Sequence, residues 1–198
     1  MAPPTSTELY TPRFSLRPFR RKDGGSVHEA VLASLPELSA YLPWANERYT
    51  RSVTNQYIRE SASAWIEGRA FDFSIRSQAQ PDRHLGNMSV WFTSRPNAVG
   101  EVGYWVRSDE TTRGVATEAA ARILQFAFED LDMHRVTLRI AVGNRASERV
   151  AEKLGFGLEG TLREDVKVGH MWLDHTLWSL LAQEWPRTRQ RYRAEAWI

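Results

Sequence analysis

The segment from Val99 to Phe156 constrains the fold more than any other part of the chain. It contains two short apolar runs, Val99–Val106 and His134–Val142, whose composition is typical of buried strands. The stretch between them predicts a helix that packs on a sheet through apolar residues at helical spacing, namely Ala120, Ile123, Leu124, Ala127 and Leu131. A strand, a helix and a second strand in this order predict a parallel crossover.

A turn of small residues, Thr112–Thr117, joins the first predicted strand to this helix. Gly114 has no Cβ, so a diphosphate can approach its backbone closely. The residues after it begin the helix, where free N–H groups and the helix dipole attract anions, and Arg113 adds a positive charge. A plain tight turn explains the same residues. The Walker and dinucleotide-binding patterns are absent, because no Lys-Ser/Thr pair follows Gly114 and the turn has one glycine rather than three.

A second strand–helix junction follows at Asn144. Asn144 is a good N-cap, and Ser147 lies three residues later, still in the first turn and near the end of the preceding strand. Gly155 stands where a left-handed C-cap is expected, with Phe156 as its apolar contact. Taken separately, Asn144 can act as a simple cap and Ser147 as a solvated hydroxyl.

The rest of the chain predicts the elements that would complete one mixed sheet. Strands are expected at Phe14–Phe19, Ala70–Arg76, His84–Thr93, Phe156–Arg163 and His170–Leu181. Helices are expected at Val27–Leu38 and, with Ser52 as N-cap, at Val53–Glu67. We therefore expect a single α/β domain over residues 1–198, with a loose leader at 1–10 and a basic tail at 186–198.

The composition argues against several classes of function. Cysteine is absent, so the chain has no disulfide framework, no thiolate metal site and no Cys-bound acyl intermediate. No apolar run approaches the ~20 residues of a membrane span, and the first residues lack a secretion signal, so we expect a cytoplasmic protein with no membrane partner. The 26 basic and 24 acidic residues are spread along the chain except at the tail, which argues against direct nucleic-acid binding.

Short stretches spread over nearly the whole chain carry a family resemblance when they are taken in order. They are Leu16–Phe19, Leu42–Trp44, Gly103–Val106, Arg113–Ala119, Asn144–Ser147, Glu152–Phe156, Glu159–Arg163 and Asp174–His175. Together they resemble the GNAT superfamily of acyl-CoA-dependent N-acetyltransferases, and within it the branch that includes the ribosomal-protein N-terminal acetyltransferases.

The resemblance implies a GNAT-like α/β fold. Its sheet would be mixed but mostly antiparallel, flanked by helices, with one parallel strand pair splayed to hold acyl-CoA. The implied cosubstrate is acetyl-CoA, with no metal. The implied acceptor is a primary amine, either a protein N-terminus such as that of a ribosomal protein or a small molecule, and a homodimer is possible.

The resemblance also implies a set of cofactor-binding residues. The family's pyrophosphate loop falls on Thr111–Ala116, where Gly114 and Ala116 match and Thr111 replaces the usual Gln or Arg. The remaining members of this loop and of the helix start are Thr112, Arg113, Val115 and Thr117. Trp105 and Val106 fall where the strand end pairs with the pantetheine arm, and the Val106 N–H would polarise the thioester carbonyl.

Three further residues follow from the second junction. Asn144 falls near the implied pantetheine arm, and Ser147 falls where this branch has a hydroxyl near the cofactor sulfur, as a proton donor to the departing thiolate. Lys153 could approach the cofactor's 3′-phosphate, although a surface lysine explains it equally well.

The general base is left open by the sequence. In a related class a glutamate follows the Leu-Arg stretch, but the corresponding position here is Val166, with Asp165 and Glu164 as neighbours. Glu101 is a second candidate, because a charge on a central strand is unusual unless it faces a cleft. His170 and His175 are further alternatives, and water can also relay the proton.

Tyr41 and Trp44 are expected to wall the acceptor pocket, because aromatic loop residues often line ligand sites, and Trp91 and Phe92 are alternatives. The predicted function is direct acetyl transfer to an amine. A non-catalytic acyl-CoA-binding sensor is the alternative, supported by the departures at Thr111 and Val166.

Overall fold

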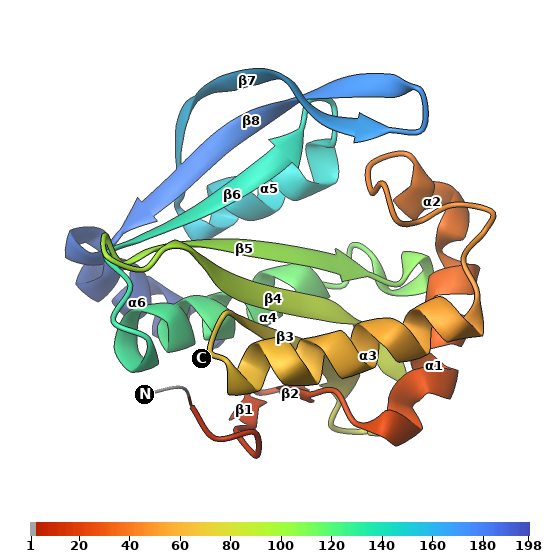
Figure 1. Cartoon of the computed structure of the whole chain (residues 1–198). Helices are drawn as coiled ribbons and strands as arrows, with labels where there is room; N and C mark the ends of the chain where they lie inside the picture. The colour runs from red at the N-terminus through yellow and green to blue at the C-terminus, as the bar shows by residue number, and fades with distance from the viewer. Residues whose placement is uncertain (1–2) are drawn as a thin grey trace.

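The computed structural model describes residues 3–198, and in it eight strands form one mixed sheet (Figure 1). The strand order is β1-β2-β3-β4-β5-β6-β8-β7, and only the β5–β6 pair is parallel. The strands are β1 (Leu9–Tyr10), β2 (Phe14–Pro18), β3 (Ala70–Ser77), β4 (His84–Ser94), β5 (Val99–Val106), β6 (Arg135–Ala141), β7 (Gly157–Val168) and β8 (Met171–Leu181). This arrangement confirms the predicted fold class.

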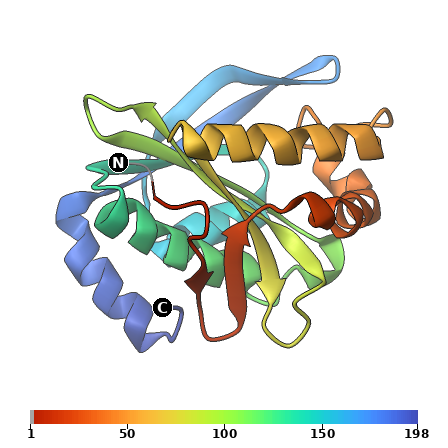
Figure 2. The ribbon, with the colours of Figure 1, turned by 60° about the horizontal axis from the view of Figure 1, so that its bottom comes forward.

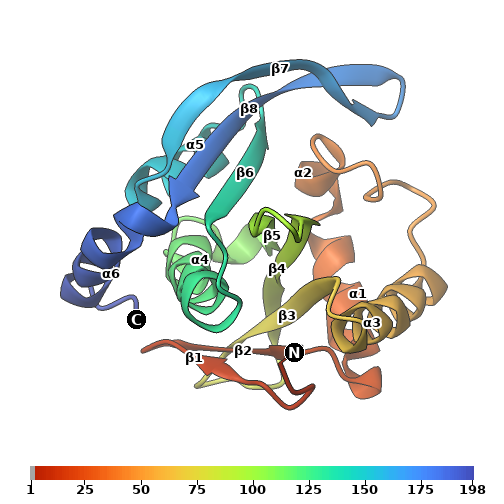
Figure 3. The same ribbon diagram turned by 60° about the vertical axis from the view of Figure 1, so that its left-hand side comes forward.

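Helices cover both faces of the sheet (Figure 3). On one side lie α1 (Gly24–Ala33), α2 (Leu35–Ser39) and α3 (Arg51–Ile66). On the other lie α4 (Val115–Gln125), its π-helical continuation η3 (Phe126–Asp130), α5 (Arg145–Leu154) and α6 (Trp185–Ala194). Short 3-10 turns occur at η1 (Arg21–Asp23), η2 (Ser108–Glu110) and η4 (Ala182–Glu184). Among the described residues, no helix combines the length and the apolar composition that a membrane span requires.

The largest core cluster lies between the sheet and α4. Phe71, Phe73 and Ile75 alternate along β3 with polar residues, and all three are at most 1% exposed. Phe71 and Phe73 meet Phe126 edge to face. Burying one such side chain contributes ~1.5–3 kcal/mol, so this face of the sheet anchors α4 firmly.

The parallel pair is very short. β5 and β6 are in register only at Val99–Arg135, Gly100–Val136 and Glu101–Thr137. Beyond these positions β5 remains paired with β4 on its outer side, and β6 with β8, so the two strands diverge (Figure 1). The result is a wedge, defined here as the gap between Val102–Val106 of β5 and Leu138–Ala141 of β6.

Both ends of the described chain pack onto the body of the protein, whereas a loose leader was expected at 1–10. Leu9–Tyr10 forms β1 against β2, and the Trp65 indole N–H donates to the Pro3 carbonyl at 2.9 Å. Met1 and Ala2 lie outside the described residues. The basic tail forms α6 beside α4 (Figure 2), and buried Tyr192 donates from its hydroxyl to the Leu154 carbonyl at 2.7 Å.

Candidate functional site

Helix α4 follows the end of β5 that borders the wedge. Gly114 precedes α4 with a φ of 79°, a left-handed conformation that favours glycine, so a glycine there suits this turn. The first turn of α4 contributes the free N–H groups of Val115, Ala116 and Thr117. This arrangement leaves a ready anion-binding position at the turn. Thr111, Thr112 and Arg113 lie beside it and are exposed.

A buried carboxylate fixes the turn to the N-terminal hairpin. Glu118 is 2% exposed and accepts hydrogen bonds from the Thr11 hydroxyl at 2.6 Å and from the Arg13 Nε at 2.6 Å. The Arg13 Nη1 also donates to the Arg113 carbonyl at 3.0 Å. Because Glu118 is paired and hydrogen-bonded, it can be buried without the usual cost of an isolated charge.

Cationic side chains surround the same turn. A surface depression of about 370 Å³ is lined by three cationic residues and one acidic residue beside Gly114, namely Arg13, Lys153, Arg191 and Glu195. A Cβ built on Gly114 would lie 3.0 Å from Arg13 Nη2, so the turn and this arginine approach each other closely. Arg13 and Arg191 were missed at the sequence level, because neither lies in a motif and α6 was not expected there.

The backbone of β5 faces the wedge at Val106. The Arg107 N–H donates to the Leu85 carbonyl, on the β4 side of the strand. Because N–H groups alternate sides along a strand, the Val106 N–H points the opposite way, into the wedge. Trp105 by contrast turns its side chain toward α1 and α2, where it is 7% exposed.

The second junction brings Asn144, Ser147 and Tyr104 to the open side of the wedge. The Asn144 Oδ1 accepts from the Ser147 N–H at 3.2 Å, which confirms the predicted N-cap of α5. Burial raises the pKa of Tyr104 to about 12, and the nearby Ser147 side chain lowers it in part. The Tyr104 hydroxyl oxygen is buried and forms no hydrogen bond within the described chain. Tyr104 therefore places a buried, protonated hydroxyl next to the predicted Ser147.

The two predicted carboxylates meet through one arginine. Glu101 is 8% exposed and lies at the last parallel pair, where the Arg139 Nε donates to its two oxygens at 3.0 and 3.1 Å. The Arg139 Nη1 donates to Asp165 at 3.2 Å, and His175 Nδ1 lies 3.6 Å from the same carboxylate. Burial raises the pKa of Glu101, while the positive charge of Arg139 lowers it.

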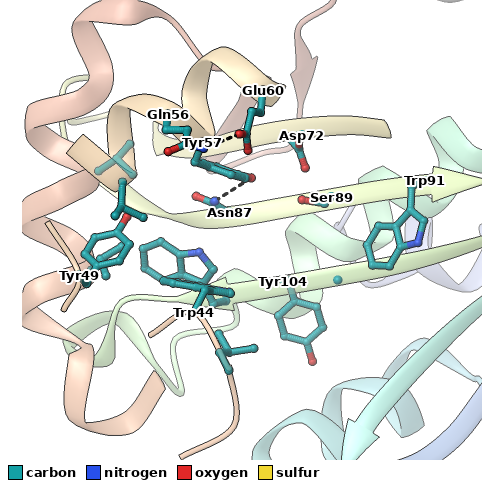
Figure 4. A pocket seen from close by; sticks show the side chains of 16 residues that line it. Trp44, Tyr49, Gln56, Tyr57, Glu60, Asp72, Asn87, Ser89, Trp91 and Tyr104 are labelled. Carbon is teal, nitrogen blue, oxygen red and sulfur yellow. Dashed lines mark hydrogen bonds between the residues drawn. The ribbon is translucent and has the colours of Figure 1, made fainter. Parts of the chain in front are cut away.

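A cavity of about 520 Å³ lies between the sheet and α1–α3 and extends to β5 (Figure 4). Trp44 and Trp91 line it, with Tyr49 and Tyr57. Tyr41 and Phe92 are not part of its lining. Its other polar and aromatic members on the sheet are Asp72, Asn87, Ser89, Tyr104 and Trp105.

Sequence reasoning missed most of this lining. Asp72 lies in the predicted strand Ala70–Arg76 and Tyr57 in the predicted helix Val53–Glu67, but neither was expected to line a site. Strand alternation places Asp72 on the face opposite Phe71 and Phe73, but nothing in the sequence shows that the opposite face is hollow. Within residues 3–198, no group of three or more His, Cys, Asp or Glu side chains is arranged to hold a metal ion.

Comparisons with known proteins give a consistent result. The model of the acetyltransferase (GNAT) domain family matches residues 13–157. The "Putative ribosomal N-acetyltransferase YdaF" of Bacillus subtilis (strain 168) is 29% identical over 86% of this chain and 92% of its own length. The "Probable N-acetyltransferase YjcK" of the same organism is 30% identical over 69% of this chain and 76% of its own length.

Solved structures agree with this match. A structure of Mycobacterium smegmatis RimJ in complex with CoA-disulfide is 26% identical, superposes with a TM-score of 0.83, and covers 96% of this chain and 93% of that one.

Proposed function

Because this chain belongs to the GNAT acetyltransferase family, we propose that it transfers the acetyl group of acetyl-CoA directly to a primary amine. The observation that carries the proposal is the wedge between β5 and β6, together with the free N–H groups at the start of α4, the next helix after β5. The CoA-disulfide in the RimJ structure supports a cofactor of this kind. The name of the relative YdaF supports a ribosomal protein N-terminus as one class of acceptor, and a small-molecule amine is the other.

Several features of the chain fit acetyl-CoA. The Gly114 turn would hold the pyrophosphate through backbone N–H groups, with Arg113 nearby and Lys153 on the side of the 3′-phosphate. The β5 edge at Trp105 and Val106 would accompany the pantetheine arm, because β6 no longer pairs with it there.

When bound, acetyl-CoA supplies a thioester whose carbonyl carbon forms a bond to the amine nitrogen as the bond to sulfur breaks. The Val106 N–H would donate to the carbonyl oxygen as negative charge develops on it. Glu101 would accept the proton of the amine, directly or through water, and Asp165 is the second candidate. The hydroxyl of Ser147, or that of Tyr104 beside it, would protonate the departing sulfur.

Thiol release tests the proposal. Purified protein with acetyl-CoA and a panel of primary amines is expected to release free CoA thiol. Measurable acetyl-CoA binding with no release for any amine would contradict catalysis and favour an acyl-CoA sensor.

A variant tests the placement of the phosphates. Gly114→Trp is expected to weaken acetyl-CoA binding strongly, because the new side chain fills the turn and left-handed φ is unfavourable for tryptophan. Unchanged affinity in a folded variant would show that the phosphates bind elsewhere.

A further inference from the structure

The charged groups that line the 520 Å³ cavity are all acidic. They are Glu60 on α3 and Asp72 on β3, and no lysine, arginine or histidine lines the cavity. Neither carboxylate forms an ion pair within residues 3–198; Glu60 is exposed to solvent at the edge of the cavity, and Asp72 is half-buried. Glu60 receives one hydrogen bond, from the Gln56 side chain at 2.8 Å. Burial and the nearby charge of Asp72 raise the pKa of the Tyr57 hydroxyl. The half-buried charge of Asp72 is thus not balanced by a cation of the described chain.

Polar side chains lie beside Asp72 on the sheet. Asn87 is 7% exposed and lines the cavity, and its amide donates to the Tyr57 hydroxyl at 3.1 Å. The Asn87 Oδ1 and the His84 Nε2 are both buried without a hydrogen-bond partner in the described chain, but the Asn87 side chain interacts with His84, so the orientation of the amide or the imidazole pairs these two groups with each other. Figure 4 shows Asn87 beneath Tyr57, with Asp72 and Ser89 next to it on the sheet. The charge that has no counterpart here is therefore that of Asp72, which suits a ligand with positive charge.

The aromatic walls favour the same charge. Trp44 and Tyr49 pack with ring centroids 5.7 Å apart, and Trp44 and Trp105 with centroids 6.3 Å apart. The faces of such rings attract cations, and their bodies cover the aliphatic part of an amine. A cation in this cavity thus meets ring faces along its length and carboxylates at one end.

The carboxylate end lies at a defined distance from the proposed reaction site. Asp72 pairs across strands with Ser89, and Ser89 pairs with Gly103, so the three form one row. Two strand spacings separate β3 from β5, which is roughly 10 Å. Gly103 belongs to the part of β5 that borders the wedge. Asp72 is thus too far across the sheet to hold the reacting nitrogen at the wedge.

We propose that the acceptor carries two positive charges: the amine that is acetylated at the wedge, and a second ammonium or guanidinium group that pairs with Asp72 and Glu60. This inference rests on the proposed acetyl transfer. A free polyamine and a peptide with a basic residue next to its amino terminus both present this chemistry.

Matched acceptors test the inference. 1,6-Diaminohexane and n-hexylamine have the same carbon chain but differ by one charge, and the two nitrogens of the diamine lie about 9 Å apart when extended, which matches roughly two strand spacings. Tetrapeptides that begin with serine followed by arginine or by glutamate differ in the same sense. The specificity constant kcat/KM for the dication is expected to exceed that of its partner by about tenfold or more, as for one charged hydrogen-bonded contact. The better of 1,6-diaminohexane and the arginine peptide identifies the source.

Asp72→Asn locates the second charge. The variant is expected to remove the preference for 1,6-diaminohexane while leaving n-hexylamine turnover and acetyl-CoA affinity unchanged. Glu67→Gln is the matched control, because it removes a carboxylate at the end of α3 that does not line the cavity. Equal use of 1,6-diaminohexane and n-hexylamine, unaffected by Asp72→Asn, would overturn the inference and leave acetyl transfer intact. A preference for the glutamate peptide would also overturn it.

Binding separates this inference from the proposed function. If no amine releases thiol, acetyl transfer fails, and calorimetric titration of 1,6-diaminohexane then decides about the cavity. Binding of this diamine that weakens in Asp72→Asn supports a dication site. Equal affinities of 1,6-diaminohexane and n-hexylamine for the wild-type protein would contradict it.

Discussion

Glu101 is the residue whose environment bears most directly on catalysis. It is buried at the apex of the wedge, and both of its oxygens face the Arg139 Nε. Burial raises its pKa above the ordinary value of 4.5, while Arg139 limits the rise. A carboxylate with a raised pKa is a stronger base than an ordinary one.

Glu101→Gln is expected to lower kcat by about a hundredfold or more, because a positioned base is lost. Acetyl-CoA affinity, measured by calorimetry, is expected to stay the same. A kcat near that of the wild-type protein would show that Glu101 is not the base and that Asp165 or water accepts the proton.

Arg139→Gln is expected to move the acidic limb of the kcat/KM profile to higher pH. Arg139 lowers the pKa of Glu101, so its removal lets burial raise that pKa further, and the base is protonated over a wider range. An unchanged acidic limb in this variant would show that Glu101 does not control it.

His84 is expected to make the fold sensitive to acid. It is fully buried, its Nδ1 lies 2.8 Å from the Ser74 hydroxyl, and burial lowers its pKa to about 3. The unfolded chain binds the proton near pH 6.5 but the folded chain does not, so stability is full above that pH and falls toward pH 3. The loss is roughly 4–5 kcal/mol over this range. Urea unfolding at several pH values measures it, and His84→Phe should flatten the dependence even if its absolute stability changes.

At the scale of elements, α5 is defined at both ends by its own sequence. Asn144 caps the start, and Gly155 ends it with a φ of 83°. Asn144→Ala is expected to cost about 1 kcal/mol of unfolding free energy, because the Ser147 N–H loses its acceptor. Asn144→Asp preserves an acceptor oxygen and should retain most of the stability in the same urea titration. Equal losses in the two variants would mean that the cap bond is not the cause.

The start of α3 shows where such local reasoning is less accurate. Ser52 was predicted as N-cap, but the helix begins at Arg51 and Thr50 is the cap, with its hydroxyl accepting from the Val53 N–H. Serine and threonine both act as N-caps, so residue type alone does not decide between two positions that lie two residues apart.

At the scale of the whole molecule, α6 packs in the core and also contacts the residues proposed to bind the cofactor phosphates. Tyr192 is fully buried against α5, and the Arg191 Nη2 donates to the Lys153 carbonyl at 2.9 Å beside the Gly114 turn. Deletion of residues 186–198 is therefore expected to lower the Tm and also to weaken acetyl-CoA binding.

A point variant separates the two effects. Arg191→Gln keeps Tyr192 in the core, so it should retain the Tm while reducing acetyl-CoA affinity, as measured by calorimetry. Full affinity in this variant would show that α6 contributes only stability.

The sequence by itself determined the local parts of this protein. The apolar run Val99–Val106 is β5 without a shift of either end, and the cap at Asn144 and the turn at Gly114 lie where their residue types predict. These features depend on neighbours within a few positions, so backbone sterics and short-range hydrogen bonds suffice to specify them. The ordered motifs also led to the family, which the domain match confirms.

The tertiary structure alone decided the wedge, the ion network and the cavity. β5 and β6 separate after three pairs while β4 and β8 stay paired with their outer edges, and Arg139 on β6 contacts Glu101 on β5 and Asp165 on β7 only through that arrangement. Likewise, Asp72 on β3 and Tyr57 on α3 share a cavity because α1–α3 cover the sheet there. Contacts between residues far apart in sequence depend on how whole elements pack, and no local pattern of residue types records that packing.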